Sequence, residues 1–156
     1  MIQLGRIVVN ANELESYITY AIFMLTSEPT ELSEEYRLIM SIIWKDGFEK
    51  RLHVLDNIFK AKVEDLHLID DFNNLRERTK SLYSKRNAYV HSDWAFAEDD
   101  SYVGRMRNLK YLRTEFEPYP PVKNLSQLAD ELSACAGELA NFMYNVKEIL
   151  KRQKND

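Results

Sequence analysis

The side chains best suited to chemistry on a phosphate lie in one short stretch, Arg86–His91 (RNAYVH), which we call the 86–91 segment. An arginine presents five donors in a rigid fork that fits phosphoryl oxygens, and a histidine can accept or donate a proton near neutral pH. On a regular helix Asn87 and His91 lie one turn apart on one face, whereas Arg86 and His91 are about 140° apart. Arg86 can therefore turn towards the other two side chains only if the helix ends there or its face opens into a cleft.

Other catalytic or metal-binding patterns are missing from the sequence. The four glycines form no phosphate-binding loop, and neither a GxSxG nor an HExxH motif occurs. His53 and His67 have acidic neighbours but no second histidine at a ligand spacing, so both are interpreted as surface ion-pair residues. Cys135 lies on an apolar stretch and is interpreted as a core residue. The sequence therefore predicts no metal site and no cofactor.

Length and composition are those of one globular domain spanning residues 1–156. Hydrophobic residues make up 45% and charged residues 29%, which excludes the disordered and fibrous classes. The net charge of −4 argues against a uniformly basic surface for nucleic acid, although basic residues gather at 76–86 and 105–113. With one cysteine, no signal peptide and no run of about 20 apolar residues, we expect a cytoplasmic protein without a membrane segment.

Apolar residues recur at spacings of three and four in several stretches, which predicts a predominantly all-α protein. We expect an up-and-down bundle of four to five helices, with a short hairpin or extended excursion around 94–116 that ends at the prolines 118–121. Gly47 is expected to end one helix, and Asn124 or Ser126 to cap the last. The charged tail 151–156 is expected to fray. The apolar stripe over residues 4–25 can serve either as intramolecular core or as a dimer seam.

Arg86 falls on the apolar stripe of the helix predicted from residue 66 onward. A buried arginine is costly unless its guanidinium is paired, so this position calls for a partner or a cavity. Glu15, which flanks the apolar stripe of the first helix, is a candidate partner of Arg86. A purely structural role stays open, in which Arg86 pairs with a buried carboxylate and His91 neutralises the dipole of the helix end.

The pattern Arg86-Asn87-x-x-x-His91, near the end of a long helix in a small helical domain, resembles the RNxxxH form of the Arg-x4-6-His motif of the HEPN superfamily. Residues 12–15, 82–85 and 92–94 fit the same helical pattern, but only the motif itself is specific. Ser92 stands where many members have glycine, so the turn after the motif departs from theirs. The resemblance covers most of the chain as an order of elements, and it implies a helical fold.

The resemblance also implies a function. Many members with this motif are metal-independent endoribonucleases that act as homodimers, some of them toxins or defence components with an antitoxin or regulatory protein as partner. In that case Arg86 contacts the scissile phosphate, His91 acts as general base or acid for attack by the RNA 2′-hydroxyl, and Asn87 orients these groups. A two-fold dimer would supply a second histidine. Two alternatives stay open: a non-catalytic HEPN-like dimeric module that binds nucleotide, RNA or a protein, and a plain helical interaction protein.

Basic and aromatic residues on either side of the 86–91 segment are candidates for binding single-stranded RNA. If the excursion at 94–116 folds back beside the segment, cations there could follow a phosphate backbone while an aromatic ring stacks on a base. The candidates are Arg78, Lys85, Trp94, Arg105 and Arg107.

Overall fold

The computed structural model describes residues 2–26, 34–43, 45–91, 93–96, 103–108, 114–118 and 122–153. They form five helices and a small sheet, in the order α1 (Ile2–Thr26), α2 (Glu34–Ile43), α3 (Phe48–Lys62), α4 (Leu66–Val90), β1 (Asp93–Phe96), β2 (Val103–Asn108), β3 (Thr114–Pro118) and α5 (Val122–Gln153). The predicted helical bundle is confirmed. None of the helices in this part of the chain is long and apolar enough to cross a membrane.

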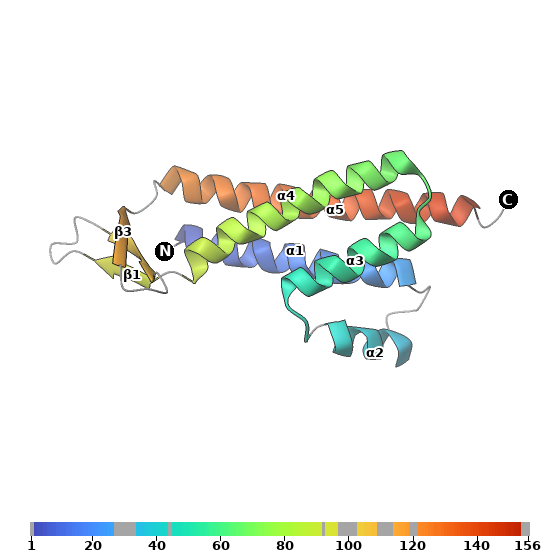
Figure 1. The fold of residues 1–156 in the computed structure, drawn as a ribbon, viewed down its shortest axis with the longest axis horizontal. Coiled ribbons are helices and arrows are strands. Elements are labelled where there is room, and N and C mark those ends of the chain that lie inside the picture. Colours follow the sequence, from blue (N-terminus) through green and yellow to red (C-terminus); the bar gives the residue numbers. More distant parts are fainter. Residues whose placement is uncertain are drawn as a thin grey trace.

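Helices α1, α3, α4 and α5 run along a common long axis, and α2 lies to one side of them (Figure 1). The apolar stripe of α1 faces the inside of this bundle, where Ile7, Leu14 and Ile18 are fully buried. Its periodicity of three and four residues matches the helical turn and so keeps one continuous face against α5 and α3. The stripe is therefore intramolecular core, and it is not available as a dimer seam.

The middle of the core is aromatic. The ring centroids of Phe59 on α3 and Phe72 on α4 lie 4.2 Å apart, and Phe142 of α5 packs 5.8 Å from Phe59. Leu125 and Leu132 of α5 are fully buried, as the spacing of the last helix predicts. This packing holds α3, α4 and α5 together and fixes the orientation of α4 in the bundle.

The helix boundaries match expectation only in part. A new helix begins directly after Gly47, as the break in the apolar pattern predicts, but α2 already ends at Ile43. Gly47 is the N-cap of α3 with φ −68° and ψ 164°, an extended conformation open to any residue. Helix α5 begins at Val122, before the expected caps Asn124 and Ser126. It also continues to Gln153, so residues 151–153 are helical rather than frayed, while 154–156 lie outside the described residues.

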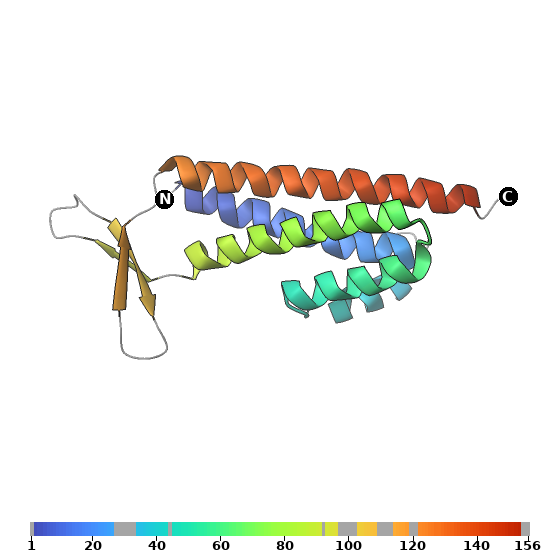
Figure 2. The same cartoon turned by 45° about the horizontal axis from the view of Figure 1, so that its top comes forward.

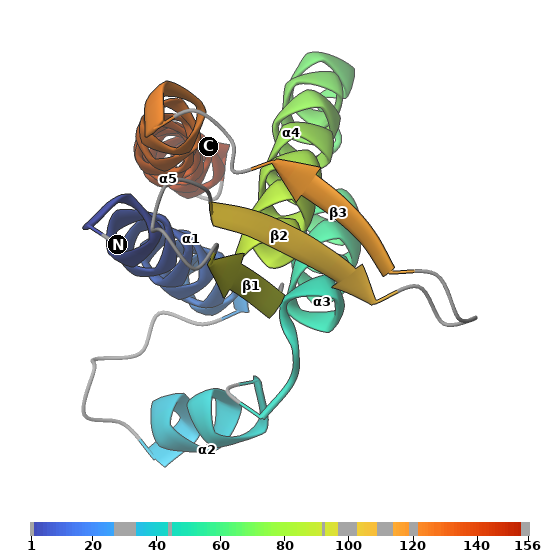
Figure 3. The same ribbon diagram turned by 90° about the vertical axis from the view of Figure 1, so that its left-hand side faces the viewer.

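The excursion around 94–116, predicted as a short hairpin or an extended segment, contains three antiparallel strands in the order β1-β2-β3. Trp94 of β1 lies opposite Arg105 of β2, and Met106 of β2 lies opposite Phe116 of β3. The sheet sits beyond one end of the helices, where α4 ends and α5 begins (Figure 2). Viewed from that end, the strands lie in front of α1, α4 and α5 (Figure 3). The last turn of α4 therefore lies between the bundle and the sheet.

Candidate functional site

The last turn of α4 brings Arg86, Asn87 and His91 together. The helix ends at Val90, and His91 is its C-cap with φ −100° and ψ 18°, held by a bond of 3.1 Å from its N–H to the carbonyl of Asn87. Because His91 leaves the helical path, Arg86 Nη1 lies 3.2 Å from His91 Nε2 and donates to Asn87 Oδ1 at 2.9 Å. Because the helix ends here, Arg86 can reach Asn87 and His91, as the spacing in the sequence requires. We call these three residues the Arg86 site.

Arg86 and His91 face each other at the end of the helix. A guanidinium has five donors and no acceptor, so a hydrogen bond between Arg86 Nη1 and His91 Nε2 needs the arginine as donor and Nε2 as acceptor. Asn87 and His91 are exposed and Arg86 is half-buried, so a ligand from solvent can reach all three.

Glu15 binds other partners than the one expected. Its carboxylate accepts from Arg51 Nη2 of α3 and from the Tyr83 hydroxyl of α4. Among the contacts of the described residues, no hydrogen bond or ion pair joins Glu15 to Arg86. The expectation that Glu15 pairs with Arg86 is thus wrong, because Arg51, whose side chain is 9% exposed, already occupies the carboxylate.

Tyr83 connects the Glu15 carboxylate to Arg86. Its ring stacks on Phe48 with centroids 3.6 Å apart, and the Arg86 Cζ lies over the same ring, 5.3 Å from its centroid. Burial, followed by the hydrogen bond to Glu15, raises the pKa of Tyr83 to about 12. The Arg86 Nε is buried and has no hydrogen-bond partner within the described part of the chain. The guanidinium is thus supported by a cation–π contact with the Tyr83 ring, which is itself held by Glu15 and Phe48.

Arg51 and Tyr83 were not among the residues singled out from the sequence. Arg51 lies three residues after Phe48 and four before Leu55, which places it on the apolar stripe of α3. A cation on an apolar stripe needs a partner, so Arg51 could have been found from the sequence in the same way as Arg86. Tyr83 lies within the stretch 82–85 that fits the HEPN helical pattern, and only its contacts reveal a polar role.

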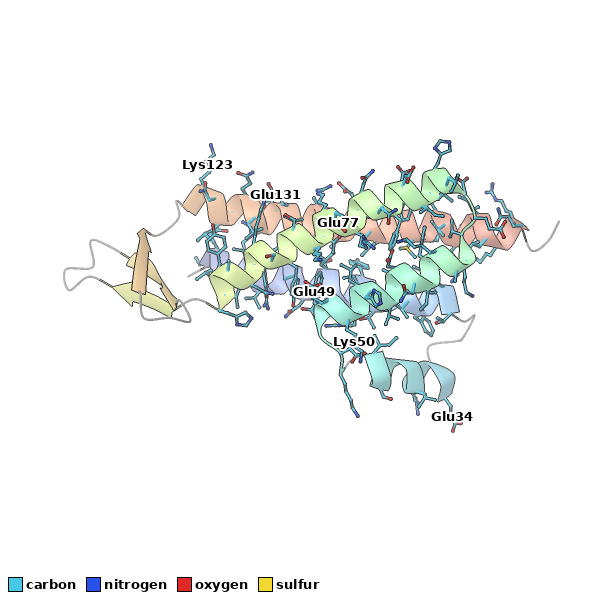
Figure 4. All side chains as sticks on the ribbon, viewed as in Figure 1. Glu34, Glu49, Lys50, Glu77, Lys123 and Glu131 are labelled. Carbon is cyan, nitrogen blue, oxygen red and sulfur yellow. The ribbon has the colours of Figure 1, made fainter. Side chains whose placement is uncertain are left out.

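Arg78 and Lys85 lie on the opposite flank of α4 from Asn87 and His91. Arg78 forms an ion pair with Glu138 of α5. Lys85 lines a groove between α4 and α5, together with Tyr89 and Glu131. The two flanks are visible in Figure 4, where Glu131 of α5 lies on one side of α4 and Glu49 at the start of α3 on the other. Two of the candidate RNA-binding cations, Arg78 and Lys85, therefore lie on a different flank of α4 from Asn87 and His91.

The remaining predicted RNA contacts fall on the sheet. The backbones of Trp94 and Arg105 are paired across β1 and β2, and Arg107 lies two positions further along β2, on the same face as Arg105. Strand β1 begins two residues after His91, so the excursion starts beside the Arg86 site. The side chains of these three residues lie outside what the structure describes.

The described residues form no metal centre that would indicate a function, and no known relative indicates one either. These residues contain no group of three or more His, Cys, Asp or Glu side chains arranged to hold a metal ion. Neither the family models nor the curated proteins nor the solved structures include a significant match to this chain. Inference about function therefore depends on the geometry of the Arg86 site and on the motif that it contains.

Proposed function

We propose that the chain is a HEPN-like, metal-independent endoribonuclease that cleaves single-stranded RNA at the Arg86 site. The observation that supports this most strongly is the convergence of Arg86, Asn87 and His91 at an exposed helix end, with Arg86 Nη1 within 3.2 Å of His91 Nε2. A phosphate bound to this guanidinium would lie next to the basic nitrogen of His91. The site of one chain thus offers a cation for the phosphate and a base for the ribose 2′-hydroxyl.

In the proposed reaction, the RNA phosphate replaces His91 Nε2 as a partner of the Arg86 guanidinium. The freed Nε2 lone pair takes the proton of the 2′-hydroxyl while the 2′-oxygen attacks the adjacent phosphorus. The bond from phosphorus to the 5′-oxygen breaks, which leaves a 2′,3′-cyclic phosphate on one product and a 5′-hydroxyl on the other. Arg86 stabilises the negative charge that develops on the phosphoryl oxygens. Asn87, which accepts from Arg86 Nη1 at 2.9 Å, keeps the guanidinium turned towards His91.

The departing 5′-oxygen needs a proton, and one chain offers one histidine at this site. A homodimer with two-fold symmetry would bring a second His91 to the cleft, so that one histidine accepts a proton and the other donates one. This requirement is the reason for proposing a dimer. An RNA-cleaving enzyme of this kind fits a cytoplasmic toxin or defence component that an antitoxin or regulatory protein restrains.

The test is cleavage of a single-stranded RNA pool in EDTA, with the product ends identified. We expect products ending in a 2′,3′-cyclic phosphate, and a loss of activity of at least about 100-fold in His91→Ala. Lys62→Ala, which removes an exposed cation from the last turn of α3, is the control and should retain most activity. RNA bound by the wild type without cleavage would support the non-catalytic binding module instead.

A further inference from the structure

We propose that Tyr83 is a positioning residue for Arg86, and that Glu15 and Phe48 hold Tyr83 in place. The kinetic part of this proposal rests on the proposed ribonuclease function, whereas the structural part concerns the order of the Arg86 side chain alone. Three helices contribute to the arrangement: Glu15 comes from α1, Phe48 from α3, and Tyr83 with Arg86 from α4.

Arg86 has few other constraints. A free arginine side chain loses about 2 kcal/mol of rotamer entropy when it is fixed, so a guanidinium must be held by several contacts to present one fixed face. Its described partners Asn87 and His91 both bind Nη1 and are both exposed. The Tyr83 ring is the only described aromatic group over the guanidinium. Tyr83 thus supplies the contact that holds the Arg86 guanidinium on the side facing the bundle.

The Tyr83 ring is in turn fixed from two directions. Phe48 stacks on it with an interplanar angle of 2°. The hydroxyl donates to Glu15, a carboxylate that Arg51 also holds, while Arg51 donates further to Thr19 at 3.2 Å. A ring held at its face and at its hydroxyl cannot tilt without breaking one of these contacts. The order of Arg86 therefore depends on Glu15, Phe48 and Arg51, which are not part of the Arg86 site itself.

Kinetics of three variants test the catalytic consequence. Tyr83→Leu should lower kcat by about 3- to 30-fold, as expected from the loss of a cation–π contact, with little change in KM. Tyr83→Phe keeps the ring, its stack on Phe48 and the contact with Arg86 but loses the hydroxyl that Glu15 holds, so its kcat should lie between those of Tyr83→Leu and the wild type. Tyr144→Leu, which removes an exposed tyrosine of α5, is the control and should leave kcat unchanged. Equal kcat in Tyr83→Leu and the wild type would overturn the proposal.

A second measurement separates this proposal from the ribonuclease proposal. The Nε of Arg86 is buried, so its N–H should exchange slowly with water in NMR spectra of the wild-type protein, with the signal assigned by its loss in Arg86→Lys. In Tyr83→Leu the exchange should accelerate at least about tenfold, in Tyr83→Phe by less, and Tyr144→Leu should keep the slow rate. An unchanged rate in folded Tyr83→Leu would refute positioning. A wild-type protein that never cleaves RNA would refute only the ribonuclease proposal and leave the positioning of Arg86 by Tyr83 standing.

Discussion

Removing the Glu15 carboxylate should destabilise the fold far more than removing an exposed carboxylate from the same helix. In Glu15→Ala the guanidinium of Arg51, whose side chain is 9% exposed, keeps only the Thr19 hydroxyl at 3.2 Å as a described partner. The Tyr83 hydroxyl also loses its acceptor. Breaking a buried ion pair by removing one partner costs about 3–5 kcal/mol, and the lower end applies to this pair because the Glu15 side chain is itself 18% exposed.

A loss of about 3 kcal/mol corresponds to a fall in Tm of about 6–12 °C for a domain of this size. Urea unfolding followed by circular dichroism at pH 7 measures it, with calorimetry for the Tm. The matched control is Glu13→Ala, an exposed residue on the same helix, which should change the free energy of unfolding by less than about 0.5 kcal/mol. A loss below about 1 kcal/mol in Glu15→Ala would show that Arg51 finds water or another partner, and the reasoning would be wrong.

Three further outcomes follow from the contacts. Asp56→Ala should cost less than Glu15→Ala, about 1–2 kcal/mol in urea unfolding, because its partners Lys60 and Arg76 are 42% and 27% exposed and can turn to water; an equal or larger loss would contradict this. Leu132→Ala, at a fully buried position, should cost about 2–5 kcal/mol, and a loss below 1 kcal/mol would contradict the core assignment. The pKa of Tyr83 is raised from 10.0 to about 12, so the stability that its neutral form contributes is complete below pH 10 and is lost as the pH rises towards 12. The difference in tyrosinate absorbance between wild type and Tyr83→Phe should therefore have its midpoint near pH 12, and a midpoint near 10 would contradict the burial and the hydrogen bond.

The helices were predictable because apolar residues at three- and four-residue spacing can be buried together only on a helix. Their ends were less so. The start of α5 at Val122 and the extended N-cap at Gly47 depend on backbone geometry that leaves no mark in the apolar pattern. Similarly, the aromatics of 94–116 indicated extended chain, but the number of strands depends on how the chain turns between them.

For the site, the sequence indicated which residues need partners but not which partners they have. Arg86 required explanation on its apolar stripe, yet its supports proved to be Tyr83 and the two polar residues of its own segment. Glu15 was expected beside Arg86, but its carboxylate pairs with Arg51 of α3. Lys85 is next to Arg86 in sequence but not at the same surface. Neighbouring residues point about 100° apart on a helix and so line different surfaces.

The central claim is that the Arg86 site cleaves RNA through the ribose 2′-hydroxyl. The most direct measurement uses a single-stranded RNA whose cleavage position has been mapped with the wild-type protein, resynthesised with one deoxyribose on the 5′ side of that phosphate. In EDTA, we expect cleavage at this position to disappear while other positions are still cut. Cleavage at the deoxyribose at an unchanged rate would contradict attack by the 2′-hydroxyl, and with it the assignment of His91 as the base.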